Sequence, residues 1–175
     1  MAASAVALLT GLTPDQIQTG LAQFQGAEGR SQVRDLKPAR KIICDYYNAS
    51  PVSMKAAFEL LGSTGQSKRR WACLADMKEL GTDELKFHRE LAPTLLAAHP
   101  HGVLLYGPRM RALLEELKLQ KFSGELLHFE TPEQLAQALA PKLASDDVVL
   151  IKGSRSMKME IVWETLLKLS PELGP

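Results

Sequence analysis

The sequence has little of what would place it in a special class of protein. Its only two cysteines, Cys44 and Cys73, each lie inside an apolar run, so a disulfide framework or a cysteine-based metal site is not expected. It has no apolar stretch of about 18 residues, and a membrane-spanning helix is therefore not expected. Residues 1–12 carry no basic segment of the kind that opens a signal peptide. These absences favour a cytoplasmic protein with reduced, buried thiols.

Charge of one sign is also missing. The chain carries 21 Lys and Arg against 20 Asp and Glu, a formal net charge of +1, which gives no support for binding to nucleic acid. A phosphate-binding loop of the G-x-x-x-x-G-K-[ST] type is absent as well. The segment "GSTGQSK" at 62–68 has the wrong spacing and lies between a predicted helix and a predicted strand. The four histidines share no metal-ligand spacing, and no metal site is expected on this chain.

What is present is the pattern of a compact α/β domain. Apolar runs of five or six residues alternate with amphipathic stretches of 10 to 17 residues. The predicted strands are 32–36, 41–45, 71–75, 102–106, 125–129 and 147–152, and the predicted helices are 14–24, 51–61, 82–98, 108–118, 132–143 and 157–169. Strands followed by helices indicate right-handed crossovers and a mostly parallel sheet. Continuously apolar strands indicate a sheet with helices on both faces.

Polar residues follow three of these strands, at the end where ligands bind in open parallel sheets. They are "DYYNAS" after Cys44, "DMKELG" after Ala75 and "KGSRS" after Ile151. Because the carboxyl ends of parallel strands share one edge of the sheet, these three loops form one candidate site.

Two of the three loops have a ligand-binding interpretation and a structural one. Asp45 could accept hydrogen bonds from sugar hydroxyls or hold a cation, but Asn48 or Ser50 could equally be capping the helix that begins at Pro51. In the last loop, Lys152 and Arg155 precede a predicted helix start and favour an anion, a carboxylate above all. The alternative there is a solvated basic turn.

Taken in order, these motifs resemble the C-terminal domain of the Mur ligases. They are D-x-Y-N-A-x-P-x-S-M-x-A at 45–56, D-M-x-E-L-G at 76–81 and K-G-S-R-S-M-x-M-E at 152–160, preceded by "GRSQV" at 29–33. The resemblance implies a Rossmann-like C-terminal domain over 26–175, and residues 1–25 resemble the last helices of the family's central ATPase domain. A related, weaker resemblance is to folylpolyglutamate synthase.

The closest branch of the family implies a reaction. ATP phosphorylates the terminal carboxylate of a UDP-N-acetylmuramoyl-tripeptide, and the amine of D-alanyl-D-alanine then attacks the acyl phosphate. The family's central domain, absent from this chain, supplies most of the ATP and Mg site, and an N-terminal domain holds the UDP. The chain alone is therefore expected to be inactive. The alternative function is a free-standing, non-catalytic module that binds a nucleotide or a peptide.

The resemblance also assigns a nucleotide site. Arg30 would reach the nucleotide phosphates, Asp45 would accept hydrogen bonds from the ribose, and Asn48 would shape the pocket beside it. Tyr46 stands where the family usually has serine, and its larger ring could crowd the ribose.

For the incoming dipeptide, the resemblance assigns four residues in the second and third loops. Asp76 would meet the ammonium group of D-alanyl-D-alanine. Lys152, Ser154 and Arg155 would face its carboxylate or the acyl phosphate.

Overall fold

The computed structural model describes residues 2–23, 27–36, 39–64 and 69–169. The strands are Gln32–Leu36 (β1), Arg40–Asp45 (β2), Arg70–Ala75 (β3), Gly102–Tyr106 (β4), Glu125–Phe129 (β5) and Val148–Lys152 (β6). The α-helices are Ala2–Leu9 (α1), Pro14–Gln23 (α2), Pro51–Ser63 (α3), Glu84–Arg89 (α4), Ala92–Ala97 (α5), Met110–Leu119 (α6), Pro132–Leu139 (α7) and Glu160–Leu169 (α8). Short 3-10 turns are Gly81–Asp83 (η1), Ala140–Lys142 (η2) and Arg155–Met157 (η3).

None of the helices in these ranges has the length and apolar character needed to cross a membrane.

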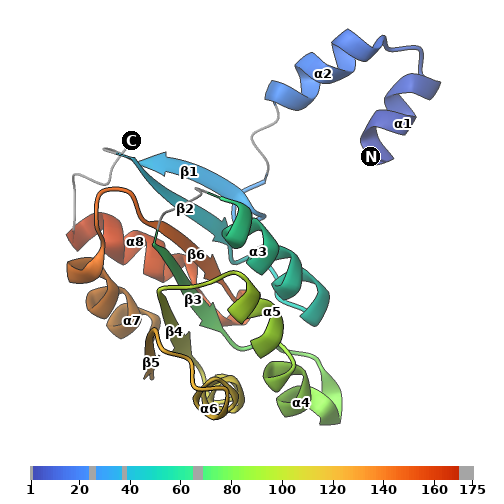
Figure 1. The fold of residues 1–175 in the computed structure, drawn as a ribbon. Coiled ribbons are helices and arrows are strands. Elements are labelled where there is room, and N and C mark those ends of the chain that lie inside the picture. The colour runs from blue at the N-terminus through green and yellow to red at the C-terminus, as the bar shows by residue number, and fades with distance from the viewer. Residues whose placement is uncertain (1, 24–26, 37–38, 65–68, 170–175) are drawn as a thin grey trace.

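The six strands form one sheet in the order β1-β2-β6-β3-β4-β5 (Figure 1). All neighbours are parallel except β1, which runs antiparallel to β2 at one edge. The mostly parallel α/β sheet expected from the sequence is therefore confirmed. β6, the last strand in the chain, lies between β2 and β3 in the middle of the sheet.

Helices cover both faces of this sheet. Helices α3, α5 and α6 pack on one face and α7 and α8 on the other (Figure 1). Neighbouring strand residues alternate between the two cores: Ile43 and Leu150 belong to the first, Ile42 and Ile151 to the second, and all four are fully buried. Burial on both faces explains why the strands read as continuous apolar runs in the sequence.

Two of the helix starts are set by side chains that the sequence pattern indicates. At α2, the Thr13 amide donates to Gln16 Oε1 (2.9 Å) and the Gln16 amide to Thr13 Oγ1 (3.3 Å), which together form a capping box. At α3 the cap is Ser50, whose hydroxyl accepts from the Ser53 amide (3.3 Å). Because Ser50 caps the helix, Asn48 is not needed as its cap.

The single helix predicted over 82–98 is wrong. The segment forms η1, α4 and α5, with a break at Glu90 and Leu91. Pro93 is the second residue of α5 and has no amide hydrogen to donate to the carbonyl four residues earlier, so a continuous helix is interrupted there. Leu85, an apolar residue inside the predicted helix, is exposed.

Two other helix boundaries differ from prediction by three residues or more. Helix α7 ends at Leu139 instead of 143, because Pro141 follows within the 3-10 turn η2. Helix α8 begins at Glu160 instead of 157, because Lys158 adopts a left-handed backbone (φ 52°) after η3. The segment at 62–68 continues α3 through Ser63, and its residues 65–68 lie outside the described part.

Helices α1 and α2 stand apart from the sheet and its covering helices (Figure 1). The two helices pack mainly against each other. Several apolar side chains in this segment are exposed: Val6, Leu8, Leu9, Leu12 and Leu21. The domain boundary expected near residue 26 falls at residues outside the described ranges and stays a prediction.

Candidate functional site

The carboxyl edge of the parallel strands brings the three predicted loops together. Asp45 and Lys152 occupy the same rung of the β2–β6 ladder, and Leu74 is opposite Lys152 on β3. Since β6 is central, its last residue touches the ends of both neighbouring strands. The site is therefore built around Lys152.

The nucleotide-type residues predicted from the sequence line a single pocket. This cavity, which we call the β2 pocket, has a volume of about 300 Å³ and is lined by Arg30, Ser31, Asp45, Tyr47, Asn48, Ser53, Ala56, Ala57 and Lys152. All three residues predicted to contact the nucleotide are in this wall, together with Lys152. The pocket thus lies between the end of β2, the start of α3 and the chain that precedes β1.

Lys152 forms the floor of the β2 pocket. Its side chain is 1% exposed, and its ammonium donates to Asp45 Oδ2 (2.5 Å) and to the backbone carbonyl of Asn48 (2.9 Å). A buried ammonium needs a carboxylate partner and further hydrogen bonds to offset the loss of its water. Lys152 has both, so it fixes the loop after β2 and is not a free ligand group.

Asp45 is the hub of this pocket. Its Oδ1 accepts from both the amide (2.8 Å) and the hydroxyl (3.2 Å) of Ser31, while Oδ2 accepts from Lys152. A carboxylate has about four acceptor positions, so one remains for a ligand hydroxyl. With 13% of its side chain exposed, Asp45 can present that position to the pocket.

Arg30 stands at the mouth of the pocket. Its guanidinium carbon lies 4.1 Å from the centre of the Tyr47 ring, a cation–π contact that limits where the side chain can go. Among described contacts, it has no carboxylate within salt-bridge range. A guanidinium held in place with its fork free is suited to bind phosphate oxygens.

Asn48 is exposed at the rim, and its Oδ1 accepts from the Ala49 amide (2.8 Å). Its side-chain amide group therefore faces outward as a donor. The capping interpretation and the ligand-binding interpretation of this loop are therefore compatible. Ser50 caps α3, while Asp45 and Asn48 line the pocket.

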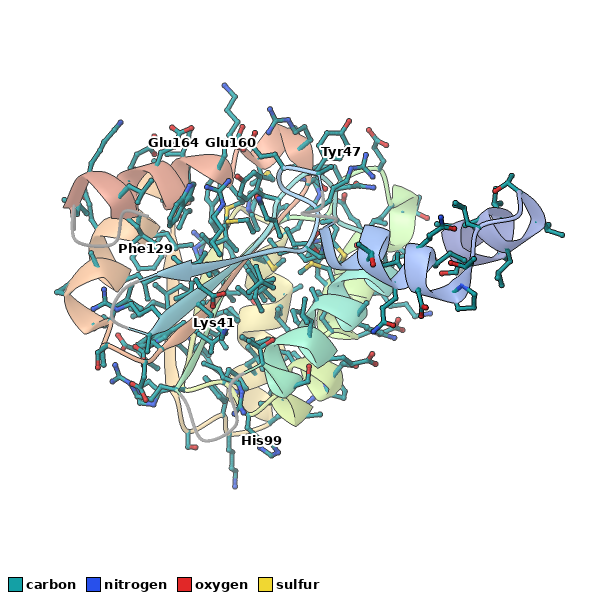
Figure 2. The ribbon with its side chains drawn as sticks, turned by 90° about the horizontal axis from the view of Figure 1, so that it is seen from above. Lys41, Tyr47, His99, Phe129, Glu160 and Glu164 are labelled. Atoms are coloured by element: carbon teal, nitrogen blue, oxygen red, sulfur yellow. The ribbon has the colours of Figure 1, made fainter. Side chains whose placement is uncertain are left out.

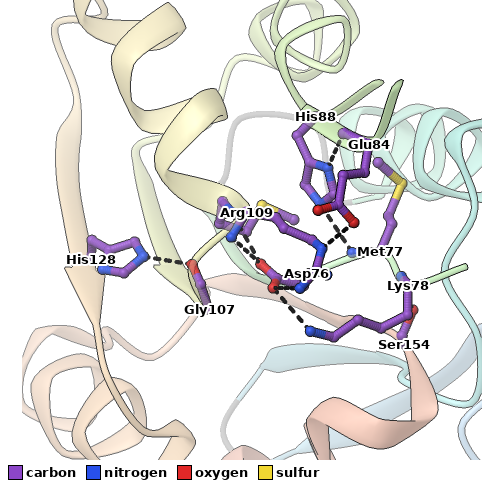
Figure 3. Close-up of polar contacts among 10 residues, drawn as sticks. Asp76, Met77, Lys78, Glu84, His88, Gly107, Arg109, His128 and Ser154 are labelled. Atoms are coloured by element: carbon purple, nitrogen blue, oxygen red, sulfur yellow. Dashed lines mark hydrogen bonds and ion pairs between the residues drawn. The ribbon is translucent and has the colours of Figure 1, made fainter. Parts of the chain in front are cut away.

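Asp76, predicted to meet the dipeptide ammonium, is instead fully buried (Figure 3). Its Oδ1 accepts hydrogen bonds from the backbone amides of Arg109 and Met110 at the start of α6 (both 3.0 Å). Its Oδ2 forms ion pairs with the Lys78 ammonium (3.2 Å) and the Arg109 guanidinium (3.4 Å). Arg109 also pairs with Glu84. The Asp76 carboxylate therefore ties the β3 loop to α6.

Backbone contacts join this loop to the one after β6. The Ser154 amide donates to the Asp76 carbonyl (3.1 Å), and Ser154 Oγ accepts from the Lys78 amide (2.8 Å). The loop after β4 also packs tightly against Asp76 at Gly107 (φ +104°). A Cβ atom at this position would lie only 2.6 Å from Asp76 Oδ1, so a larger residue would not fit without a shift. Asp76 and Ser154 thus shape the edge of the sheet from inside.

His88 belongs to the same network and is fully buried (Figure 3). Its Nε2 accepts from the Met77 amide (3.0 Å), and its Nδ1 donates to the Glu84 carbonyl (2.6 Å). These two partners fix a neutral ring. Burial lowers the pKa of His88 below its ordinary value of 6.5.

This lowered pKa predicts an acid sensitivity. The unfolded chain binds a proton at His88 at a higher pH than the folded one does, so acid favours unfolding. The stability that neutral His88 contributes should be complete above about pH 6.5 and lost progressively as the pH falls through the lower folded pKa. Urea unfolding measured at several pH values between 5 and 8 should show that the free energy of unfolding depends less steeply on pH in His88→Gln than in the wild type. His99→Gln, at an exposed site, should keep the wild-type slope, and an unchanged slope in His88→Gln would count against this account.

On the other side of Tyr47 lies a second cavity, which we call the α8 pocket. Its volume is about 390 Å³ and its walls are Glu28, Tyr46, Tyr47, Arg155, Glu160 and Glu164. Tyr46 is part of this wall and packs in the core beneath α8, so its ring does not line the β2 pocket. The expected crowding of a ribose by Tyr46 is therefore not seen.

Arg155 is the predicted dipeptide residue that remains accessible. Its side chain is 61% exposed and pairs with Glu160 Oε1 (2.7 Å). The helix start predicted beside it is the three-residue turn η3, which offers no row of free amides. An anion at this position would therefore depend on the Arg155 guanidinium.

Sequence reasoning missed several residues of these two pockets. Ser31 holds Asp45 from 14 positions earlier, and only the antiparallel pairing of β1 with β2 brings them together. Glu160 and Glu164 stand four residues apart on α8, a spacing that could have been noticed as two carboxylates on one helix face.

The described residues were compared with the donor set that a metal ion needs. Within the described ranges, no group of three or more His, Cys, Asp or Glu side chains could hold a metal ion. No chemical step is therefore assigned to a metal on these residues.

Comparison with known proteins agrees with this geometry. Residues 29–155 match the family model of the Mur ligase glutamate ligase domain. The UDP-N-acetylmuramoyl-tripeptide–D-alanyl-D-alanine ligase of Bacillus subtilis is 32% identical over 169 residues, covering 96% of this chain and 37% of that protein. The chain thus spans little more than a third of the length of this relative.

Solved structures show the same relationship. The crystal structure of MurF ligase from Thermotoga maritima in complex with ADP has a TM-score of 0.77 and 31% identity, over 94% of this chain and 36% of that one. A MurF structure from Acinetobacter baumannii has a TM-score of 0.81 and 30% identity, over 95% and 36% of the two chains. The family match covers most of the chain. The chain therefore belongs to the Mur ligase family and corresponds to the C-terminal domain of its members.

Proposed function

We propose that this chain is the C-terminal domain of an ATP-dependent ligase that joins D-alanyl-D-alanine to a UDP-N-acetylmuramoyl-tripeptide. The observation that carries the proposal is the β2 pocket, where Arg30, Asp45 and Asn48 meet at the carboxyl edge of the sheet. The relatives at about 30% identity are ligases of this kind, and one solved relative contains ADP. A free-standing binding module is not favoured by these comparisons.

In this proposal the β2 pocket holds part of the nucleotide. Asp45 accepts one ribose hydroxyl through its remaining acceptor position, and Asn48 closes the rim. Arg30 reaches the phosphates from its place against Tyr47. Most of the ATP site, with its Mg, belongs to the central domain, of which residues 1–25 are the last helices.

The proposed reaction has two steps. The γ-phosphoryl group of ATP passes to the terminal carboxylate oxygen of the tripeptide, and ADP leaves. The dipeptide amine then attacks the acyl carbon, a tetrahedral intermediate forms, and phosphate departs as the nitrogen loses a proton. Closure of this domain over the central one would exclude water, which would otherwise hydrolyse the acyl phosphate.

Within that closed site, this domain's residues position the reactants. Arg155 faces the carboxylate of the dipeptide. Lys152, Ser154 and Asp76 act from inside, because their polar groups are buried and bonded: they hold the three loops in register. The domain thus contributes binding and orientation.

Kinetics of the full-length ligase test the nucleotide assignment. Arg30→Ala should raise the KM for ATP about tenfold or more, because a charge-assisted hydrogen bond is worth roughly 1.5–3 kcal/mol. Arg30→Lys, which keeps the charge and loses the fork, should fall between wild type and alanine. Arg89→Ala on α4 is the matched control at an exposed site and should leave the KM unchanged.

The 175-residue chain alone should release no phosphate from ATP, with or without tripeptide and dipeptide. Dipeptide-dependent phosphate release by the pure chain would refute the proposal that another domain supplies the phosphate site. An ATP KM unaffected by Arg30→Ala would remove Arg30 from the nucleotide site.

A further inference from the structure

Tyr47 is the aromatic residue in the wall of the β2 pocket. It follows Tyr46 at the end of β2, but the two side chains differ in burial: Tyr46 belongs to the core, whereas Tyr47 is 47% exposed. Figure 2 shows Tyr47 at the edge of the molecule. A half-exposed ring contributes little to the core, so its place in the pocket wall points to a role in the site.

The Tyr47 ring is the partner of the Arg30 side chain. The guanidinium carbon lies over the ring, 4.1 Å from its centre. In the part of the chain that the structure describes, no hydrogen bond or ion pair engages this guanidinium. Its N–H donors therefore have no protein acceptor there, while the side chain as a whole is in contact with the ring.

The backbone on both sides of Arg30 is fixed to the loop that carries Tyr47. Before Arg30, the Gly29 carbonyl accepts a hydrogen bond from the Tyr47 amide (2.9 Å). After it, the amide and hydroxyl of Ser31 donate to Asp45 Oδ1 (2.8 and 3.2 Å). These bonds place the backbone of Arg30 beside the pocket, but they do not determine which direction its long side chain takes.

We propose that Tyr47 is a positioning residue, whose ring holds the Arg30 guanidinium at the mouth of the β2 pocket before the nucleotide phosphates arrive. This inference rests on the proposed function, which supplies the phosphate-binding role of Arg30. The apparent affinity of a site falls in proportion to the fraction of molecules in the binding-competent conformation. A contact that restricts a flexible side chain to that conformation therefore raises affinity without touching the ligand.

An aromatic partner suits this role better than an acidic one. A carboxylate would engage the N–H donors of Arg30 and repel a phosphate, whereas a ring attracts the cation through its quadrupole and carries no charge. Arg155 shows the contrast, because it pairs with Glu160 (2.7 Å) and would have to exchange that carboxylate for a ligand. At an exposed site, a cation–π contact favours the held conformation by about two- to fivefold.

Kinetics of the full-length ligase test the role with two substitutions of Tyr47. Tyr47→Leu keeps an apolar side chain but has no aromatic face, and it should raise the KM for ATP about two- to fivefold. Its kcat and its KM for D-alanyl-D-alanine should stay at the wild-type values, because only the binding of ATP uses Arg30. Tyr47→Phe keeps the ring and should restore the wild-type KM for ATP. Val52→Ala, exposed and outside the wall of the β2 pocket, is the matched control.

A double-mutant cycle separates positioning from direct contact with the nucleotide. In an Arg30→Ala background the ring has no guanidinium to hold, so Tyr47→Leu should leave the KM for ATP unchanged. If Tyr47→Leu raises this KM by the same factor with and without Arg30, the ring acts on the nucleotide itself and the positioning role is overturned. A KM raised as much by Tyr47→Phe as by Tyr47→Leu would assign the effect to the hydroxyl and overturn it as well.

Failure of the positioning role and failure of the reaction can be told apart. If the wild-type ligase forms product but Tyr47→Leu keeps the wild-type KM for ATP, the positioning role is overturned and the function stands. If no product forms from ATP, tripeptide and dipeptide, the function itself fails. Calorimetry of ATP binding to the full-length protein then decides the role of Tyr47: binding weakened by Tyr47→Leu and not by Tyr47→Phe supports it. Equal binding by all three proteins, or no binding, overturns it.

Discussion

Replacing Asp45 by asparagine is expected to lower the free energy of unfolding by about 3 to 5 kcal/mol, the cost of leaving a buried charge without its partner. The Lys152 ammonium is almost completely enclosed and would keep only backbone carbonyls, those of Asp45 and Asn48, as acceptors. An asparagine oxygen can take the place of Oδ2 but carries no charge. Urea unfolding of the chain measures the loss.

A double-mutant cycle isolates this ion pair. Lys152→Met alone should cost less, because Asp45 keeps its two hydrogen bonds from Ser31 and some contact with water. The double variant should recover a large part of the loss, since no uncompensated buried charge remains. Strictly additive losses would contradict the account.

Asp35→Asn is the matched control for this cycle. Asp35 pairs with Lys41 at the exposed edge of β1, and surface pairs of this kind contribute roughly 0–1 kcal/mol. The cycle also bears on catalysis. Inactivity of an Asp45 variant can be assigned to a lost ribose contact only in a background where the pocket remains folded.

The second large effect is expected at Asp76. Asp76→Ala should lower the free energy of unfolding by about 3 to 5 kcal/mol, because it leaves the amides of Arg109 and Met110 unpaired in the interior, each at roughly 1–3 kcal/mol. Lys78 and Arg109 also lose their shared carboxylate, although both side chains are partly in water and lose less.

Asp76→Asn separates the amide contacts from the charge. Its side-chain oxygen can still accept from the two amides at the start of α6, so its loss in urea unfolding should be clearly smaller than that of alanine. Asp83→Ala, before α4, is the control: its side chain caps nothing, and a change within about 0.5 kcal/mol is expected. Similar stabilities for wild type and Asp76→Ala would show that the network does not hold the edge together.

The strands and the position of the site could be predicted because both depend on local pattern. Apolar runs such as "KIIC" and "VVLI" are buried on both faces of the sheet, and polar residues follow directly where each strand ends. Capping residues were equally local, as Thr13 and Gln16 show. The helix over 82–98 was mispredicted because apolar periodicity outweighed a single proline, Pro93.

The direction in which the site residues point could not be predicted, because it depends on contacts far apart in the sequence. Lys152 and Asp45 are 107 residues apart, and only the insertion of β6 beside β2 pairs them. Asp76 has the same acidic side chain whether it faces solvent or caps α6, and the motif cannot distinguish the two. Glu160 and Glu164 have the spacing of an ordinary polar helix face, and the sequence does not show that they line the same cavity as Tyr46.

The position of β6 also governs the order in which this chain can fold. β2 and β3 are made early, yet within the described sheet neither pairs directly with the other; each pairs with β6, which is made after the other five described strands. Local units such as β3-α4-α5-β4 can form during synthesis, but the centre of the sheet closes only after Lys152 has left the ribosome. Until then the apolar edges of β2 and β3 are unpaired, which is when association with other chains is most favourable. The residue at the centre of the candidate site is therefore also near the end of the segment that completes the fold.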